Sequence, residues 1–212
     1  MNELDFENIL PDQIEKRSFE IITQELGNIK LADENADVIK RVIHTTADFE
    51  YVSSLCFSEN AVKHAREAIL GGASIVTDTK MASVGINAIR LSQYGGQVFS
   101  FMSDEDVAAD AKENGTTRAA ACMKKAVSID KPLIIAVGNA PTALIKLEEL
   151  IREKRIKPEL IIGVPVGFVN VVQSKELIMG AGIPYIVAKG RKGGSNVAAA
   201  ICNALIYGID GK

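Results

Sequence analysis

From residue 74 onward, the chain alternates short apolar segments with polar or glycine-containing loops and with segments of helical spacing. The apolar segments are 74–77, 97–101, 133–137, 160–164 and 185–188. Their continuous apolar character, rich in valine and isoleucine, is typical of strands that are covered on both faces of a parallel sheet. The pattern is clearest between Lys131 and Asn170, which predicts a βαβ unit that the other segments extend.

Helical periodicity dominates the chain before residue 73. Apolar residues recur at helical spacing in 11–26, 33–46 and 58–70. We therefore predict an α/β fold: a three-layer α/β/α sandwich with a five-stranded parallel sheet, preceded by N-terminal helices. The expected organisation is a single domain over 1–212, in which a helical part, 1–72, packs on an α/β core, 73–212.

Charge and hydropathy exclude several classes of partner. The 212 residues carry 24 Lys and Arg against 27 Asp and Glu, a net charge of −3, whereas nucleic-acid-binding domains usually have a basic excess. No apolar run approaches the ~20 residues of a membrane-spanning helix. The acidic segment 1–9 lacks the basic start and apolar middle of a signal peptide. We expect a cytoplasmic protein that binds neither nucleic acid nor membrane.

Cysteine and histidine are too sparse for most metal or disulfide chemistry. Cys56, Cys122 and Cys202 are odd in number and widely spaced, which favours buried free thiols in a reducing compartment. The chain has only two histidines, so a His-rich metal site is excluded and no metal is expected.

The loops that follow the predicted strands are the expected ligand region, because open α/β sheets bind ligands outside the carboxyl ends of their strands. These loops are 78–81, 102–104, 138–142, 165–168 and 190–195. None carries the GxGxxG or GxxxxGK[ST] pattern of nucleotide binding, and the chain has no GxSxG nucleophile motif. We therefore expect no nucleotide cofactor.

A histidine beside an arginine is the remaining candidate for chemistry. Arg41 and His44 are three residues apart in the predicted helix 33–46, so they can share a face. Cationic side chains also occur near predicted strand ends, at Arg118, Lys175, Arg191 and Lys192. This combination suits a polyanionic ligand held by charge-assisted hydrogen bonds, with one group that gives or takes a proton. Glycine loops leave room for a wide, flat molecule.

Each of these residues also has a purely structural interpretation. His44 is equally compatible with a helix-end histidine that is bonded to a carbonyl group. On spacing alone, Arg191-Lys192 is more typical of a solvated turn, and Ser18 of a solvent-facing or back-bonded hydroxyl inside a helix. His64 lies among charged residues and is expected on the surface.

Five motifs occur in a fixed order along the chain. They are EKRSF at 15–19, RVIH at 41–44, GNAPTAL at 138–144, GVPVGFV at 163–169 with Ser174-Lys175, and GRKGGS at 190–195. In their order and spacing, these motifs resemble the precorrin-8X methylmutase family of cobalamin biosynthesis, including its cobalt-precorrin-8 branch. The resemblance covers nearly the full length of the chain.

The resemblance implies an isomerase that moves a methyl group from ring carbon 11 to ring carbon 12 of a corrin-like macrocycle without a redox cofactor. It implies that His44 is the proton donor and acceptor, and that Ser18 and Arg41 bind substrate. To these expected substrate contacts we add, from loop placement and charge, Arg17, Asn139, Lys175, Arg191 and Ser195. Members of the family are homodimers, so a homodimer is expected.

Two other functions stay open at this point. The protein would alternatively be a non-catalytic corrinoid-binding carrier that protects or hands on an unstable intermediate, or an unrelated nucleotide-linked α/β enzyme. Loops 78–81 and 114–118 depart from the aerobic branch of the family. They leave open whether the substrate is precorrin-8X or cobalt-precorrin-8, and we favour the cobalt form.

Overall fold

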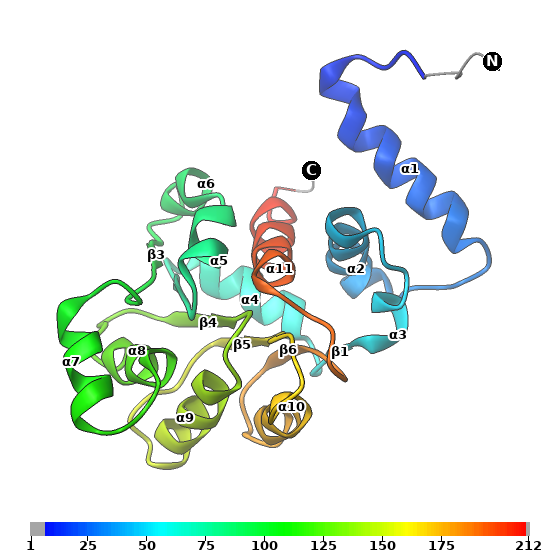
Figure 1. The fold of residues 1–212 in the computed structure, drawn as a ribbon. Coiled ribbons are helices and arrows are strands. Elements are labelled where there is room, and N and C mark those ends of the chain that lie inside the picture. The colour runs from blue at the N-terminus through cyan, green and yellow to red at the C-terminus, as the bar shows by residue number, and fades with distance from the viewer. Residues whose placement is uncertain (1–6, 211–212) are drawn as a thin grey trace, which may run out of the picture.

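The computed structural model describes residues 7–210. The prediction that segment 1–9 is not a signal peptide falls mostly on residues outside this described part. Six strands of the described residues form one sheet, in the order β1-β6-β5-β4-β2-β3 (Figure 1). Neighbouring strands are parallel except for β1 and β6. The strands are β1 (Leu55–Phe57), β2 (Ser74–Thr77), β3 (Val98–Phe99), β4 (Leu133–Val137), β5 (Leu160–Gly163) and β6 (Tyr185–Ala188).

Helices cover both faces of this sheet, which confirms the predicted three-layer α/β/α architecture (Figure 1). On one face lie α2 (Asp33–Thr46), α4 (Ala61–Leu70), α5 (Lys80–Gly85) and α11 (Ser195–Tyr207). On the other face lie α7 (Glu105–Glu113), α8 (Arg118–Ala126), α9 (Pro141–Arg152) and α10 (Val171–Met179). The remaining helices are the 3-10 helix η1 (Pro11–Gln13), α1 (Ile14–Leu26), α3 (Tyr51–Ser54) and α6 (Ala88–Ser92).

The central strands supply side chains to both cores. In β4, Ile134 and Ala136 belong to the core beneath α2, α4 and α11, whereas Leu133, Ile135 and Val137 belong to the core beneath α8 and α9. Successive side chains of a strand point to opposite faces, and both faces are covered here, so all five residues are buried. This explains why the strand segments are apolar without alternation.

The sheet has one strand more than predicted. β1 is three residues long and pairs antiparallel with β6, with Leu55 opposite Ala188. A segment this short shows no period, and its partner lies at the far end of the sequence, so no local pattern reveals it. β1 lies inside 1–72, and the N-terminal part therefore contributes a strand as well as helices. The division of the chain into 1–72 and 73–212 stays a prediction.

The strand order reverses once, and this reversal determines where the ligand loops meet. After β2 the chain places β3 on one side of it, and then crosses to place β4 on the other side. Such a topological switch point is the usual ligand site of an open α/β sheet. The loops that begin at Asp78 and Gly138 leave β2 and β4 here.

α1 stands apart from the sandwich and packs on α2 (Figure 1). Ile22 and Leu26 are its buried residues, while Ile14 and Ile21 are exposed. α2, in contrast, packs closely along α11 and buries four side chains. α1 is therefore held mainly through α2.

The cysteines are free thiols, as predicted. Cys122 and Cys202 are buried, and Cys56 is half-buried. Burial raises the pKa of Cys122 to about 11 and that of Cys202 to about 12, so both thiols stay protonated and unreactive at neutral pH. None of the helices within residues 7–210 is long and apolar enough to cross a membrane.

Leu147→Ala should lower the free energy of unfolding by about 2–5 kcal/mol, because Leu147 is fully buried and its truncation leaves a cavity in the core beneath α9. Ile145→Ala on the exposed side of the same helix is the matched control, with an expected change within about 0.5 kcal/mol. Urea unfolding of both variants measures the difference. Equal effects would contradict this orientation of α9.

Candidate functional site

Asp78 occupies the switch point between β2 and β4. Its carboxylate accepts hydrogen bonds from three consecutive backbone N–H groups, those of Gly138 (2.8 Å), Asn139 (2.9 Å) and Ala140 (2.7 Å). The residue is 1% exposed. Burial raises the pKa of Asp78, and the three N–H groups oppose that shift because they stabilise the carboxylate. The amides of this loop are thus satisfied from within the protein rather than left for a ligand.

Beside this network, two hydroxyl groups connect the loop after β2 to the start of α11. Thr79 Oγ1 and Ser195 Oγ lie 2.8 Å apart, and Thr79 Oγ1 also accepts from the N–H of Ala82 (3.1 Å). Glycine is needed at position 138, because a Cβ there would lie 2.7 Å from Ser195 Cα. Of the two residues predicted in this region, Asn139 is exposed, whereas Ser195 is buried with its hydroxyl inside the network.

The loop between β6 and α11 is held by Lys175 of α10. Lys175 is 1% exposed, and its ammonium group donates to the carbonyl oxygens of Gly190 and Lys192, both at 2.8 Å. Burial lowers the pKa of Lys175 to about 8. The sequence suggests Lys175 as a substrate contact, but in the structure its ammonium contacts the loop that carries Arg191.

Arg191 and Lys192, two of the three cationic residues of this loop, have different surroundings. Arg191 is exposed, its Cζ lies 5.4 Å from the ring centroid of Phe168, and it makes no ion pair within residues 7–210. Lys192 Nζ lies 2.6 Å from carboxylate oxygens of both Asp48 and Glu50. Arg191 therefore remains uncompensated, although its position in an exposed turn also agrees with the structural interpretation.

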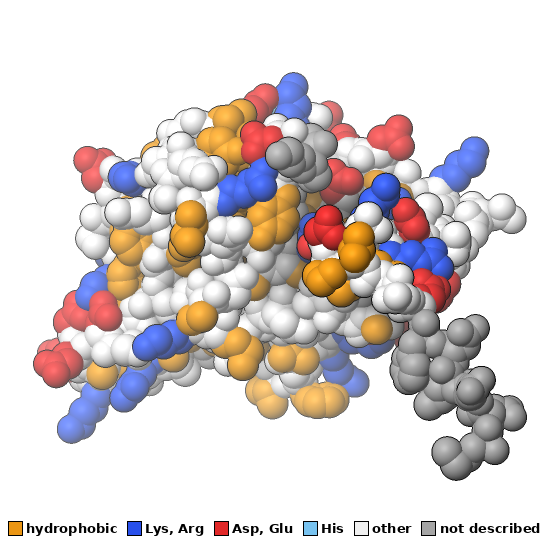
Figure 2. Space-filling model, turned by 90° about the horizontal axis from the view of Figure 1, so that it is seen from above, with side chains coloured by type: hydrophobic (Ala, Val, Ile, Leu, Met, Phe, Trp, Pro, Cys, Tyr) orange, Lys and Arg blue, Asp and Glu red, His pale blue; other side chains and the backbone are white. Residues whose placement is uncertain are grey.

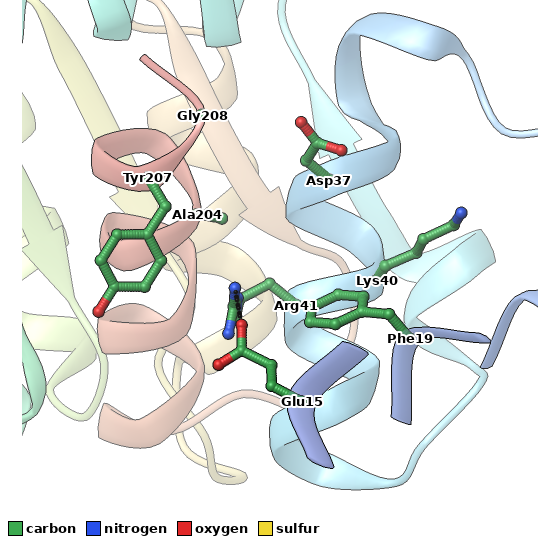
Figure 3. A pocket seen from close by; sticks show the side chains of 8 residues that line it. All are labelled: Glu15, Phe19, Asp37, Lys40, Arg41, Ala204, Tyr207 and Gly208. Atoms are coloured by element: carbon green, nitrogen blue, oxygen red, sulfur yellow. Dashed lines mark ion pairs between the residues drawn. The ribbon is translucent and has the colours of Figure 1, made fainter. Parts of the chain in front are cut away.

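A second cluster surrounds the predicted residue Arg41, where side chains of α1, α2 and α11 meet (Figure 3). Arg41 Cζ lies 4.8 Å from the ring centroid of Phe19 and 5.3 Å from that of Tyr207, distances typical of cation–π contacts. Glu15 of α1 approaches the same guanidinium, with 2.7 Å between Oε1 and Nη2. The hydrogen bond from Arg41 lowers the pKa of Glu15. Arg41 is thus oriented by two rings and one carboxylate.

His44 stacks on Phe19, one of the two rings that contact Arg41. The ring centroids are 5.3 Å apart and the ring planes are inclined by 14°. The side chain is exposed, and neither ring nitrogen makes a hydrogen bond or ion pair within residues 7–210. The described residues therefore contain no carbonyl bonded to His44, contrary to the alternative interpretation. His64 is exposed on α4, as predicted.

The two predicted residues of α1 differ in how far they are engaged. Ser18 Oγ donates to the carbonyl of Ile14 (3.0 Å), the back-bonded geometry, and keeps its lone pairs as acceptors. Arg17 donates to both carboxylate oxygens of Glu7 at 2.8 and 2.9 Å, and also lies 3.6 Å from Glu20. The charge of Arg17 is therefore already compensated.

The two groups of residues meet different ends of α11, since Arg41 contacts Tyr207 in its last turn and Ser195 begins its first turn. His44 is in the last turn of α2, and the ion pairs of Lys192 join the loop before α11 to Asp48, just after α2. No hydrogen bond, ion pair or ring contact of the described part of the chain links His44 or Arg41 to Asn139, Arg191 or Ser195. The structure thus does not bring the two groups of predicted residues into contact.

A small cavity of about 200 Å³ adjoins Arg41 (Figure 3). Its lining residues are Glu15, Phe19, Asp37, Lys40, Arg41, Ala204, Tyr207 and Gly208. A second hollow of about 340 Å³ shares Glu15, Arg41 and Tyr207 and adds Asn87 and Arg90. Ligand pockets usually measure about 300–1,000 Å³, so the first cavity by itself is too small for a large planar ligand.

Several residues of this site were not predicted. Asp78 had a local signal, a carboxylate directly after a buried strand, but its importance depends on the loop of β4, which is distant in sequence. Phe19 lies in the motif at 15–19 but was not assigned a contact, and Tyr207 had no signal, because the two come from opposite ends of the chain and meet only around Arg41.

The fold and the site define a class: an α/β protein whose switch point is closed by its own carboxylate, and whose open imidazole and guanidinium groups suit a polyanionic ligand other than a nucleotide. The family model for precorrin-8X methylmutase matches residues 13–208. The chain belongs to the precorrin-8X methylmutase family, and it is accordingly an enzyme, an isomerase of cobalamin biosynthesis.

Individual relatives agree with this assignment. The chain is 45% identical over 197 residues to the cobalt-precorrin-8 methylmutase of Priestia megaterium, a match that covers 93% of this chain and 88% of the relative. It is 37% identical to the precorrin-8X methylmutase of Sinorhizobium sp, with 91% and 92% covered. The crystal structure of precorrin-8X methylmutase from Thermus thermophilus is similar with a TM-score of 0.85 and 40% identity, covering 93% of this chain and 98% of the other. These matches confirm both the resemblance and the fold class.

Asp78→Asn should lower the free energy of unfolding by about 1–3 kcal/mol, because the amide nitrogen cannot accept an N–H bond and at least one buried loop amide loses its partner. In the Asp78→Asn variant, amide hydrogen exchange at Gly138, Asn139 and Ala140 should be faster than in the unchanged protein. Asp106→Asn, at an exposed ion pair with Lys125, is the control, with an expected change of about 1 kcal/mol or less. Unchanged exchange at the three amides would contradict the role of Asp78.

Proposed function

We propose that this protein moves a methyl group from ring carbon 11 to ring carbon 12 of precorrin-8X or cobalt-precorrin-8, giving hydrogenobyrinate or cobyrinate. The family implies a tetrapyrrole substrate. The observation that carries the proposal is the state of His44, an exposed imidazole whose nitrogens are unengaged within residues 7–210 and which shares the ring of Phe19 with Arg41. Such a group is able to exchange a proton with a bound ligand.

The proposed reaction needs a proton carrier but no nucleophile. The methyl group breaks its bond to ring carbon 11 as it bonds to ring carbon 12, and the conjugated double bonds shift to match. Atoms and electrons balance within the substrate. His44 protonates the macrocycle, or hydrogen-bonds to it, in the tautomer that allows the shift, and recovers the proton when the corrin pattern of double bonds forms. Proton transfer of this kind typically contributes ~10²–10⁴-fold.

Guanidinium groups are the proposed partners of the substrate carboxylates. The carboxylate of Glu15, now on Arg41, marks a position that a substrate carboxylate can take by exchange. Arg191 is exposed and uncompensated, so it binds a carboxylate without breaking an ion pair of residues 7–210. Ser18 and Asn139 add polar contacts. Arg17 and Ser195 are engaged within the protein, and a direct contact by either requires its present partner to be exchanged.

We favour cobalt-precorrin-8 as the substrate. Three curated cobalt-precorrin-8 methylmutases are 45%, 45% and 40% identical to the chain, while two precorrin-8X methylmutases are 37% and 36% identical. The difference is small, and cobalt-precorrin-8 methylmutases with 36% identity also occur. The identities thus support the cobalt form, and direct comparison of the two substrates decides it.

A homodimer in the cytoplasm is also part of the proposal. Large hydrophobic side chains are exposed on α1 and in the loop after β5, with Phe168 at 80% and Val169 at 78% exposure. Figure 2 shows further hydrophobic side chains at the surface, in separate groups among charged ones. A second copy would cover such groups.

Sedimentation velocity at micromolar concentration should show one species with twice the mass of the chain. Ile14→Asp, which puts a charge on the exposed side of α1, should shift it towards the monomer, whereas Leu70→Asp on α4 serves as an exposed control that should not. A monomer in the unchanged protein would contradict the dimer.

The visible absorbance spectrum should change when the protein is incubated with cobalt-precorrin-8, because the methyl shift alters the conjugation of the ring. His44→Ala and His44→Gln should slow the change by about 10²-fold or more, since each removes the proton carrier. Stopped-flow absorbance with each substrate separately measures the rates.

His64→Ala is the matched control, because it removes the other, exposed histidine and should leave the rate unchanged. Near-normal turnover by folded His44 variants would show that His44 is not the proton carrier. Tight binding of pigment without spectral conversion, with either substrate, would instead support the carrier function.

A further inference from the structure

Three consecutive carbonyl groups in the loop between β6 and α11 all accept hydrogen bonds. The donors belong to α10 and to the loop that follows β5. The carbonyls of Gly190 and Lys192 accept from Lys175 Nζ, each at 2.8 Å. The carbonyl of Arg191 between them accepts from the N–H of Gly167 at 3.1 Å. A backbone held at three successive residues has little freedom to rotate, so the direction of the Cα–Cβ bond of Arg191 is fixed as well.

The following residues are confined in the same way. The N–H of Gly194 donates to the carbonyl of Val164 at 2.9 Å. Gly193 has a φ of +157°, and a Cβ there would lie 2.1 Å from that same carbonyl oxygen. The loop therefore lies directly on the segment that follows β5, at a distance that only glycine permits.

Phe168 belongs to this segment after β5 and meets the guanidinium of Arg191, with 5.4 Å between Cζ and the ring centroid. Phe168 is 80% exposed, so the pair extends into solvent at the carboxyl edge of the sheet. The ring limits the orientation of the guanidinium plane, and a guanidinium recognises a carboxylate best when its planar fork is oriented in advance. Arg191 is thus presented, by its backbone and by Phe168, in one orientation.

A lysine is a costly choice for a purely structural donor at this position. Its side chain is 1% exposed, and its described partners are two carbonyls rather than a carboxylate. Burying an ammonium group without an opposite charge is unfavourable. We therefore expect the loop geometry that Lys175 imposes to serve the function of the protein, since burial of its ammonium group is costly.

We propose that Lys175 is a positioning residue for the methylmutase reaction: it fixes the backbone of Gly190–Lys192 so that Arg191 meets a carboxylate of the tetrapyrrole. The proposal rests on the proposed function and assigns Lys175 an indirect role. Arg191 makes the contact, and Lys175 acts through it.

The test is a double-mutant cycle with Lys175→Met and Arg191→Gln, assayed for kcat and KM with cobalt-precorrin-8. Each single variant should raise KM about tenfold, the loss expected for one charge-assisted hydrogen bond, with kcat within about twofold. The double variant should show the KM of the single variants rather than the product of both changes, because both remove the same contact. Ile178→Val, which truncates a buried side chain on the same helix, controls for a general loss of stability and should leave KM unchanged.

A second readout does not depend on turnover. Cobyrinic acid carries carboxylic acids where cobinamide carries amides, so the ratio of their dissociation constants reports carboxylate recognition. The unchanged protein should prefer the acid, and both variants should reduce that preference by the same factor. Lys175→Gln, which keeps a donor but no charge, replaces Lys175→Met in both assays if the methionine variant does not fold.

Additive changes in KM would overturn the proposal, because the two residues would then act independently. A lower midpoint of unfolding for Lys175→Met with KM and ligand preference unchanged would show that Lys175 only stabilises the fold. Absence of turnover in the unchanged protein would instead contradict the proposed function, while the corrinoid preference would still test the link between Lys175 and Arg191.

Discussion

The ligand edge of this protein depends on one buried carboxylate. In α/β sheets, backbone N–H groups that lie between a strand and the following helix commonly bind the phosphate of a nucleotide. Here Asp78 supplies the negative charge from the neighbouring strand and satisfies three such N–H groups. The loop before α9 is thereby rigid and already neutralised. The switch point binds part of the protein instead of a cofactor, which agrees with a family whose reaction moves a methyl group within its substrate.

Closing the switch point leaves ligand recognition to side chains on other elements. The loop before α11 is pinned by Lys175 through two carbonyls, and its Lys192 forms ion pairs with Asp48 and Glu50. These contacts connect the sheet edge to the end of α2, where His44 lies. The ion pairs of Lys192 therefore join the loop that carries Arg191 to the segment that follows α2.

Cationic side chains that already form ion pairs are less available to a ligand than those that do not. Cationic and acidic side chains lie next to one another at several places on the face seen in Figure 2, mainly towards its edges. Arg41 is paired with Glu15 but lies between two rings, which keep the guanidinium oriented if the carboxylate is exchanged. Since Glu15 and Phe19 belong to α1, which is held mainly through α2, small movements of this helix would change access to both Arg41 and His44.

The periodicity of the sequence was sufficient to predict the layers of the fold, whereas the chemistry of the site stays a prediction. Strands buried on both faces are continuously apolar, so five of the six strands and the helices between them could be predicted, as could His44 and Arg41 from a shared helix face. Tertiary structure alone decided the rest. β1 is recognisable only through its partner Ala188, Asp78 only through the amides of Gly138–Ala140, and the buried state of Lys175 only through the loop that it holds. Each of these depends on a contact between distant segments, and local periodicity carries no information about such contacts.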